Sequence, residues 1–190
     1  MISHNYSYSY YAKTIHAGLA LFGIAAFLTG EFAEDGADSI GFYIHAYLGL
    51  SLTFFVTMRV LSGIAGSQKM RFSSWSPFSS RQWELAFQDA YSLFKLQVPE
   101  RGMHEGLSGI TQSFGLILFG WMGATGLGLF LLVENEQKML FELIEELHEV
   151  GEALLPLYLA LHVGSVLVHS MAGTPIWQRM WKLRTTNDSD

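Results

Sequence analysis

Two histidines, His148 and His162, stand in an otherwise apolar stretch that runs from Leu147 to Met171. They are 14 residues apart, which on a straight α-helix is roughly 21 Å of rise and about 40° short of four full turns. Both imidazoles would therefore project from nearly the same face, one near each edge of a hydrocarbon layer about 30 Å thick. Two histidines arranged in this way on one membrane helix indicate axial ligands for two haem groups, one in each leaflet.

The rest of the chain is suited to hold such a helix. Half of its 190 residues are hydrophobic and only 15% are charged, against about 25% in an ordinary soluble domain. The charges are segregated, so that four apolar runs are long enough to cross a bilayer. We predict one all-α domain over residues 1–190, an integral membrane four-helix bundle with spans at about residues 12–33, 40–64, 107–133 and 147–171.

The basic residues indicate how the spans are oriented. They cluster before the first span, around the connection after the second span and after the fourth span, whereas the other two connections are acidic and contain only Lys138. Basic loops favour the cytoplasmic side, so both termini are predicted to be cytoplasmic. This orientation pairs His16 with His162 near the cytoplasmic face (the inner pair) and His45 with His148 near the opposite face (the outer pair).

The residue types narrow the chemistry further. The chain has no cysteine, which excludes thiolate metal ligands and covalent attachment of haem, so the two haem groups that the histidines indicate are expected to be haem b, held non-covalently. Iron with two imidazole ligands has no open position, so it exchanges electrons instead of binding oxygen. Arg59 lies near the cytoplasmic end of the second span, where we expect it to meet a propionate of the inner haem; the alternative is that it reaches lipid phosphate.

Two other uses of the histidines remain open at this point. Histidines can serve as hydrogen-bonding groups between membrane helices, or they can line a path for metal ions or protons. A transport path favours carboxylates in the middle of the membrane, whereas the carboxylates of this chain cluster at the ends of the spans. This distribution favours haem ligation.

The long connection between the second and third spans contains an amphipathic segment from Ser80 to Gln97. Its apolar residues at helical spacing are Trp83, Phe87, Ala90, Tyr91 and Phe94, and its charged residues are Arg81, Glu84, Asp89 and Lys95. We predict a helix that lies in the cytoplasmic interface of the membrane. Such a helix can be a simple surface anchor, a docking surface or the lid of a quinone pocket.

Several motifs together resemble those of a known family. They are His16 in the first span, HAYLG around His45, RVLSGIAG from Arg59, Arg71-Phe72, HEGLSG from His104, and LHEVGEALLPLYLALHVGSVLVHS in the fourth span. The pattern resembles the bacterial four-helix di-haem cytochromes of the b561 type, which include the b-type cytochrome subunits of nickel–iron hydrogenases. Ser62 stands where that family often has Trp, and Glu105-Gly106 where it often has Asn-Pro.

The resemblance implies haem ligation by His16, His45, His148 and His162 in a multi-pass protein of the bacterial inner membrane. It also implies respiratory electron transfer between membrane quinone and a periplasmic redox partner, either a hydrogenase or a c-type cytochrome. A second activity within the same resemblance is that of a superoxide:quinone oxidoreductase. The expected partners are therefore lipid, quinone and a redox protein, and no nucleic-acid partner is expected.

Overall fold

The computed structural model of the chain describes residues 8–33, 36, 39–67, 70–74, 78–99, 101–102, 104–133 and 137–181. These residues form helices and no strand. The elements in chain order are α1 (Tyr10–Leu28), α2 (Gly30–Ala33), α3 (Ile40–Ala65), the 3-10 turn η1 (Phe72–Ser74), α4 (Ser80–Phe94), α5 (Leu107–Leu132), α6 (Lys138–Met171) and α7 (Gln178–Trp181). Four of them, α1, α3, α5 and α6, are long and apolar enough to cross a membrane. The prediction of an all-α membrane protein with four spanning helices is confirmed.

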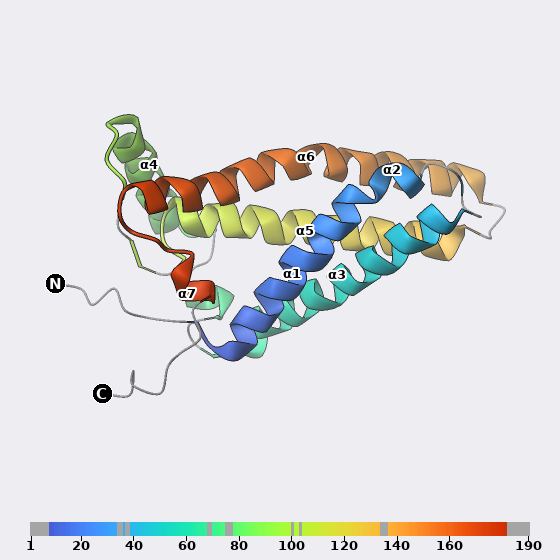
Figure 1. The fold of residues 1–190 in the computed structure, drawn as a ribbon, viewed down its shortest axis with the longest axis horizontal. Coiled ribbons are helices and arrows are strands. Elements are labelled where there is room, and N and C mark those ends of the chain that lie inside the picture. The colour runs from blue at the N-terminus through green and yellow to red at the C-terminus, as the bar shows by residue number, and fades with distance from the viewer. Residues whose placement is uncertain are drawn as a thin grey trace.

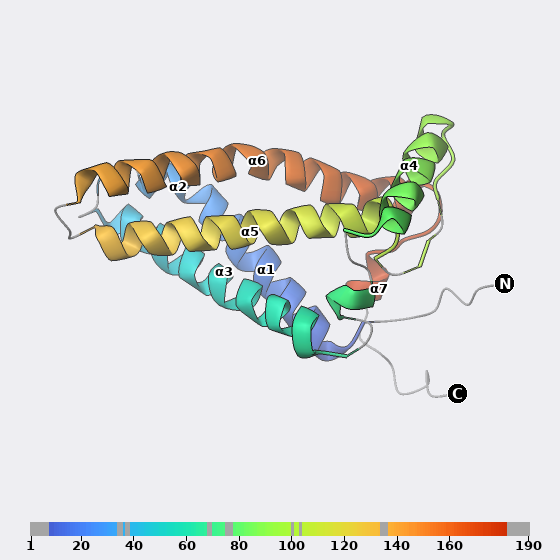
Figure 2. The ribbon, with the colours of Figure 1, turned by 180° about the vertical axis from the view of Figure 1, so that it is seen from behind.

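The four long helices form an elongated bundle, in which α1 and α3 diverge from α5 and α6 toward the end where α4 and α7 lie (Figure 1). Consecutive spans pack closely: α1 on α3, α3 on α5, and α5 on α6. The first and last described segments meet at one end of the bundle, where the Tyr8 N–H donates to the Arg179 carbonyl at 3.2 Å. We call this the terminal end, and α4 and α7 lie there as well (Figure 2).

Serines start three of the helices at the residues where the apolar pattern begins. Ser9, Ser39 and Ser79 each accept the backbone N–H three residues ahead, from Ala12, Phe42 and Gln82. Serine favours this position because its hydroxyl satisfies one of the amides that the first helical turn leaves unpaired. The starts of α1, α3 and α4 are therefore encoded locally in the sequence.

Two spans differ from the lengths that the apolar runs predict. The first run, predicted as one span over 12–33, divides into α1 and α2 at Thr29, whose hydroxyl donates to the Ala25 and Ala26 carbonyls. The fourth, predicted over 147–171, begins nine residues earlier at Lys138. Hydropathy detects only the part of a helix that lies in hydrocarbon, so it does not predict the charged first turns of α6.

Small residues lie where the spans meet, and large apolar side chains face outward. Gly115 and Ser113 are buried on α5, whereas Leu21 is 65% exposed and Leu131 is 63% exposed. Lipid tails are as apolar as leucine, so burying leucine between membrane helices brings no hydrophobic gain. Small residues permit close packing of the helices, and leucine faces the lipid. This distribution is the reverse of that in a water-soluble bundle.

Gly115 and Gly120 on α5 provide a matched test of this packing. A Cβ at Gly115 would overlap the ring of Tyr158 on α6, whereas a Cβ at Gly120 would meet nothing within 4 Å. We expect Gly115→Ala to destabilise the protein by about 1–3 kcal/mol, because the tyrosine must move, and Gly120→Ala to cause no loss. Thermal unfolding in detergent measures both; equal melting temperatures would contradict the α5–α6 packing.

Candidate functional site

Two pairs of histidines face each other across the bundle. The ring centroids of His16 on α1 and His162 on α6 are 6.2 Å apart, and those of His45 on α3 and His148 on α6 are also 6.2 Å apart. Bonds between imidazole nitrogen and metal are about 2 Å long, so two imidazoles on opposite sides of one ion place their ring centres roughly 6 Å apart. The structure thus brings together the residues of the predicted inner and outer pairs, with spacing that fits a shared metal ion.

The backbones leave room for these rings to meet end to end. Although consecutive spans pack closely, α6 does not pack closely on α1 or α3 within the described part of the chain. The paired side chains therefore bridge the open side of the bundle. One long helix, α6, contributes a member to each pair, and the two lie 14 residues apart on it.

The number of ligands restricts what could be bound. No group of three or more His, Cys, Asp or Glu side chains is placed to hold a metal ion among the residues that the structure describes. A bare zinc ion needs about four ligands, and each pair offers two. Haem iron already has four porphyrin nitrogens and needs two axial ligands, so the donor set fits haem and does not fit a free cation.

Hydrogen bonds orient both rings of the outer pair. His45 Nδ1–H donates to the Ala26 carbonyl at 3.0 Å. This carbonyl lies in the last turn of α1, where it also accepts from the N–H and the hydroxyl of Thr29. The hydrogen bond to the Ala26 carbonyl orients the His45 ring and leaves its lone pair on Nε2.

The Thr125 hydroxyl on α5 orients the His148 ring, as the Ala26 carbonyl orients His45. The hydroxyl oxygen lies 2.8 Å from His148 Nδ1, and its single proton is directed at the carbonyls of Trp121 at 2.9 Å and Met122 at 3.2 Å. The hydroxyl must then accept from His148 Nδ1–H. His148, like His45, is left with its lone pair on Nε2, the form that binds a metal.

Aromatic side chains surround the inner pair instead. The Tyr158 ring stacks on the His162 ring with centroids 5.6 Å apart, and Trp181 of α7 meets the His16 ring edge-on at 5.7 Å. Nδ1 of His16 is buried and has no hydrogen-bond partner among the described residues. A buried polar atom without a partner costs about 1–3 kcal/mol, so this end of the bundle is suited to a group that satisfies it.

The sequence did not identify these supporting residues. Tyr158 lies one helical turn before His162, and this spacing was a usable signal for their contact. Thr125 is 23 residues from His148 on another helix, and nothing in the sequence connects the two.

Arg59, predicted to meet a haem propionate, lies on α3. It is half-buried, its guanidinium carbon is 5.6 Å from the centre of the Phe72 ring, and Nη1 is 3.5 Å from the Met70 carbonyl. Its contact with a propionate stays a prediction.

His104 lies outside both pairs, in the turn before α5. It is 7% exposed, and its Nδ1 is 2.6 Å from Gln112 Oε1. Burial lowers the pKa of His104 to about 4, against a raising effect of the Gln112 hydrogen bond, and the charge of Arg59 lowers it further. The imidazole is therefore neutral at physiological pH, close to a guanidinium.

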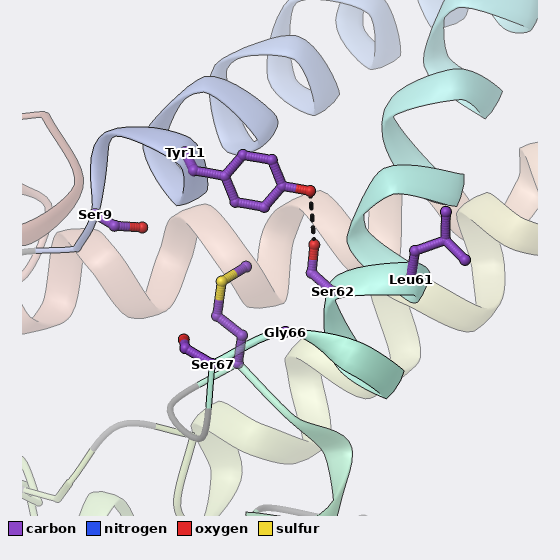
Figure 3. Close-up of a pocket in the computed structure, with 7 residues that line it drawn as sticks. Ser9, Tyr11, Leu61, Ser62, Gly66 and Ser67 are labelled. Carbon is purple, nitrogen blue, oxygen red and sulfur yellow. Dashed lines mark hydrogen bonds between the residues drawn. The ribbon is translucent and has the colours of Figure 1, made fainter.

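A cavity of about 490 Å³ opens at the terminal end between the start of α1 and the end of α3 (Figure 3). Its lining residues are Ser9, Tyr11, Leu61, Ser62, Gly66, Ser67 and Met70. The Tyr11 hydroxyl lies 2.9 Å from Ser62 Oγ, which itself donates to the Met58 carbonyl at 2.6 Å, so Tyr11 is the donor to Ser62. Tyr11 is five residues before His16, about 7.5 Å along the helix axis.

The comparisons with known proteins give one result. A family model described as prokaryotic cytochrome b561 matches residues 7–182. No curated protein and no solved structure matches the chain. The matched region includes all four paired histidines and every spanning helix.

The hydrogen bond from His148 to Thr125 can be tested separately from the ligands. Outer partners of metal-binding histidines are worth about 10- to 100-fold in affinity, so we expect Thr125→Val to weaken haem binding at the outer pair by that factor. Titration of haem into the apoprotein measures it. Thr57→Val is the matched control, since the Thr57 hydroxyl donates only to the Thr53 carbonyl on its own helix; equal affinities in the two variants would exclude the role of Thr125.

Proposed function

Since the chain belongs to the prokaryotic cytochrome b561 family, whose members are membrane b-type cytochromes that transfer electrons, we propose that it holds two b haems. The observation that carries this proposal is the equal 6.2 Å spacing of the two histidine pairs. Haem iron held in this way accepts and releases single electrons. His16 with His162 would hold the inner haem, and His45 with His148 the outer haem.

The depths of the two pairs favour electron transfer across the membrane. The two histidines of α6 are 14 residues apart, roughly 21 Å along the helix axis, so each pair would lie in its own leaflet. The basic residues near the termini favour a cytoplasmic terminal end. We therefore propose that electrons cross the bacterial inner membrane between a cytoplasmic-side site and a periplasmic-side surface, within a respiratory chain.

The cavity beside Tyr11 is our candidate for the quinone site. A quinone carbonyl can replace Ser62 Oγ as the acceptor of the Tyr11 hydroxyl proton, and the apolar exterior of the bundle gives a lipid-soluble substrate access to the terminal end. The small side chain of Ser62, at the position where relatives often have Trp, is what leaves this space open. Arg59, on the preceding turns of α3, would place its positive charge near the inner haem propionates.

The opposite end favours a protein partner. The first turns of α6 are acidic, with Glu142, Glu145 and Glu146 all exposed. Such a surface attracts a basic redox protein; we propose a c-type cytochrome or the electron-transfer subunit of a hydrogenase. The same negative charge repels superoxide, which is itself an anion, and so disfavours the superoxide:quinone oxidoreductase alternative.

The assignment of the two haems can be tested by counting them. We expect two low-spin b haems per chain in detergent-purified protein, and one in each of the variants His45→Ala and His16→Ala. His169→Ala is the control and should retain both haems, because His169 lies outside the pairs and its Nδ1 lies 2.8 Å from the Ser165 carbonyl. Haem-free wild-type protein, expressed with adequate haem supply, would refute the proposal.

The quinone site has its own pair of variants. Ser62→Trp should fill the cavity and abolish electron exchange with quinone while haem content stays at the wild-type level. Tyr11→Phe removes one hydrogen bond of about 0.5–1.5 kcal/mol, so the KM for quinone should rise roughly three- to tenfold. Tyr10→Phe, next to it on α1, is the control; full activity of Ser62→Trp would place the quinone elsewhere.

A further inference from the structure

The amphipathic helix α4 presents three distinct faces. One face is buried against the start of α5 and consists of Gln82, Ala86 and Asp89. The second is exposed and apolar, and consists of Trp83, Phe87, Tyr91 and Phe94, with exposed fractions from 47% to 87%. The third is exposed and polar, and consists of Arg81, Glu84, Gln88 and Lys95. The sequence pattern had grouped Asp89 with the charged face, whereas Asp89 is 2% exposed.

The buried face is held by polar contacts. Asp89 Oδ2 accepts the backbone N–H of Leu107 at 3.0 Å, and Asp89 Oδ1 accepts from Arg101 Nε at 2.7 Å. Gln82 Nε2 donates to the carbonyls of His104 at 2.8 Å and Gly106 at 3.2 Å. Because α5 has no side-chain cap of its own at Gly106, Asp89 supplies the N-terminal cap from another helix.

This cap fixes the height of α4 relative to the bilayer. Leu107, whose amide binds Asp89, is the first residue of the spanning helix α5. A helix is about 10 Å across, so α4 must lie within about that distance of the point where α5 enters the membrane. Figures 1 and 2 show α4 lying across the terminal end of the bundle and extending beyond its side.

The polar buried face and the apolar exposed face of α4 indicate what medium surrounds this helix. A helix on the surface of a protein in water buries its apolar face and exposes its polar one. Here the apolar face of α4 is exposed at the height where the membrane begins. Trp83 and Tyr91 are the residue types that lie at membrane–water interfaces, and the Lys95 ammonium, 4.3 Å from the Tyr91 ring centre, can extend toward lipid phosphate.

We propose that the apolar face of α4 lies in the lipid leaflet at the terminal end, at the boundary between headgroups and acyl chains. Its polar face points to water, and its buried face holds it against the start of α5. The occupant is phospholipid and not a protein partner, because α4 is fixed beside the entry point of a span and its apolar face is continuous in type with the lipid-facing surface of the bundle. This inference does not depend on the identity of the redox partners.

The absence of cysteine from the chain makes a direct test possible. Single cysteines at Phe87 (Phe87→Cys, apolar face) and Glu84 (Glu84→Cys, polar face) can carry a nitroxide label in the haem-loaded full chain. The protein is reconstituted in vesicles of phosphatidylethanolamine and phosphatidylglycerol. We expect the label at 87 to collide with dissolved oxygen more often, and with a water-soluble nickel chelate several-fold less often, than the label at 84.

Equal access of the nickel chelate to both positions in pure lipid vesicles would overturn the proposal and leave the apolar face for a protein partner. A second label, a polarity-sensitive fluorophore at Phe94→Cys, should emit at shorter wavelength in vesicles than the same fluorophore at Gln88→Cys. Unchanged haem content shows that the labelled variants are folded, since these four positions are exposed and remote from the histidine pairs.

Discussion

The arrangement of this bundle depends on the need to satisfy four imidazoles in a medium without water. Each ring has two nitrogens that require partners, and hydrocarbon offers none. The structure meets this constraint by directing the rings at one another in pairs across the side where α6 stands away from α1 and α3. The close packing through glycine and serine on the other side of the bundle is what allows that separation. A shared iron ion between each pair would complete the coordination that the rings cannot supply for each other.

The two pairs differ in what surrounds the second nitrogen of each imidazole ring. In the outer pair one nitrogen of each ring is hydrogen-bonded, to the Ala26 carbonyl in the last turn of α1 and to a threonine hydroxyl on α5. In the inner pair the surroundings are aromatic, and one ring nitrogen of His16 is unpartnered within the described residues. Hydrogen bonds from ligand imidazoles increase electron donation to a metal. Iron held by the outer pair would therefore meet stronger electron donors than iron held by the inner pair.

The two ends of the bundle also differ, in their polar contacts and in the surfaces that they expose. At the terminal end, polar and charged groups turn inward: Asp89 is bound by Arg101 and by the start of α5, and His104 is buried as a neutral imidazole. That end also contains the Tyr11 cavity and the apolar face of α4, both suited to lipid-soluble molecules. At the opposite end, α6 continues beyond its apolar run, with exposed glutamates. These differences support the proposal that one end meets lipid and quinone and the other a soluble protein, in a chain of 190 residues.

The sequence alone determined the features that are local along the chain. Hydropathy predicted the four spans, and the 14-residue interval on α6 with the charge bias of the loops paired His16 with His162 and His45 with His148. The serines that cap α1, α3 and α4 act within one turn of the chain and are local in the same sense. Only the tertiary structure decided which residues support them. Thr125, Trp181 and the Ala26 carbonyl act on rings of other helices, and Asp89 turns inward because it meets an uncapped helix start 18 residues away. Such contacts depend on the faces that neighbouring helices present to each other, and periodicity within one helix carries no information about its neighbour's rotation.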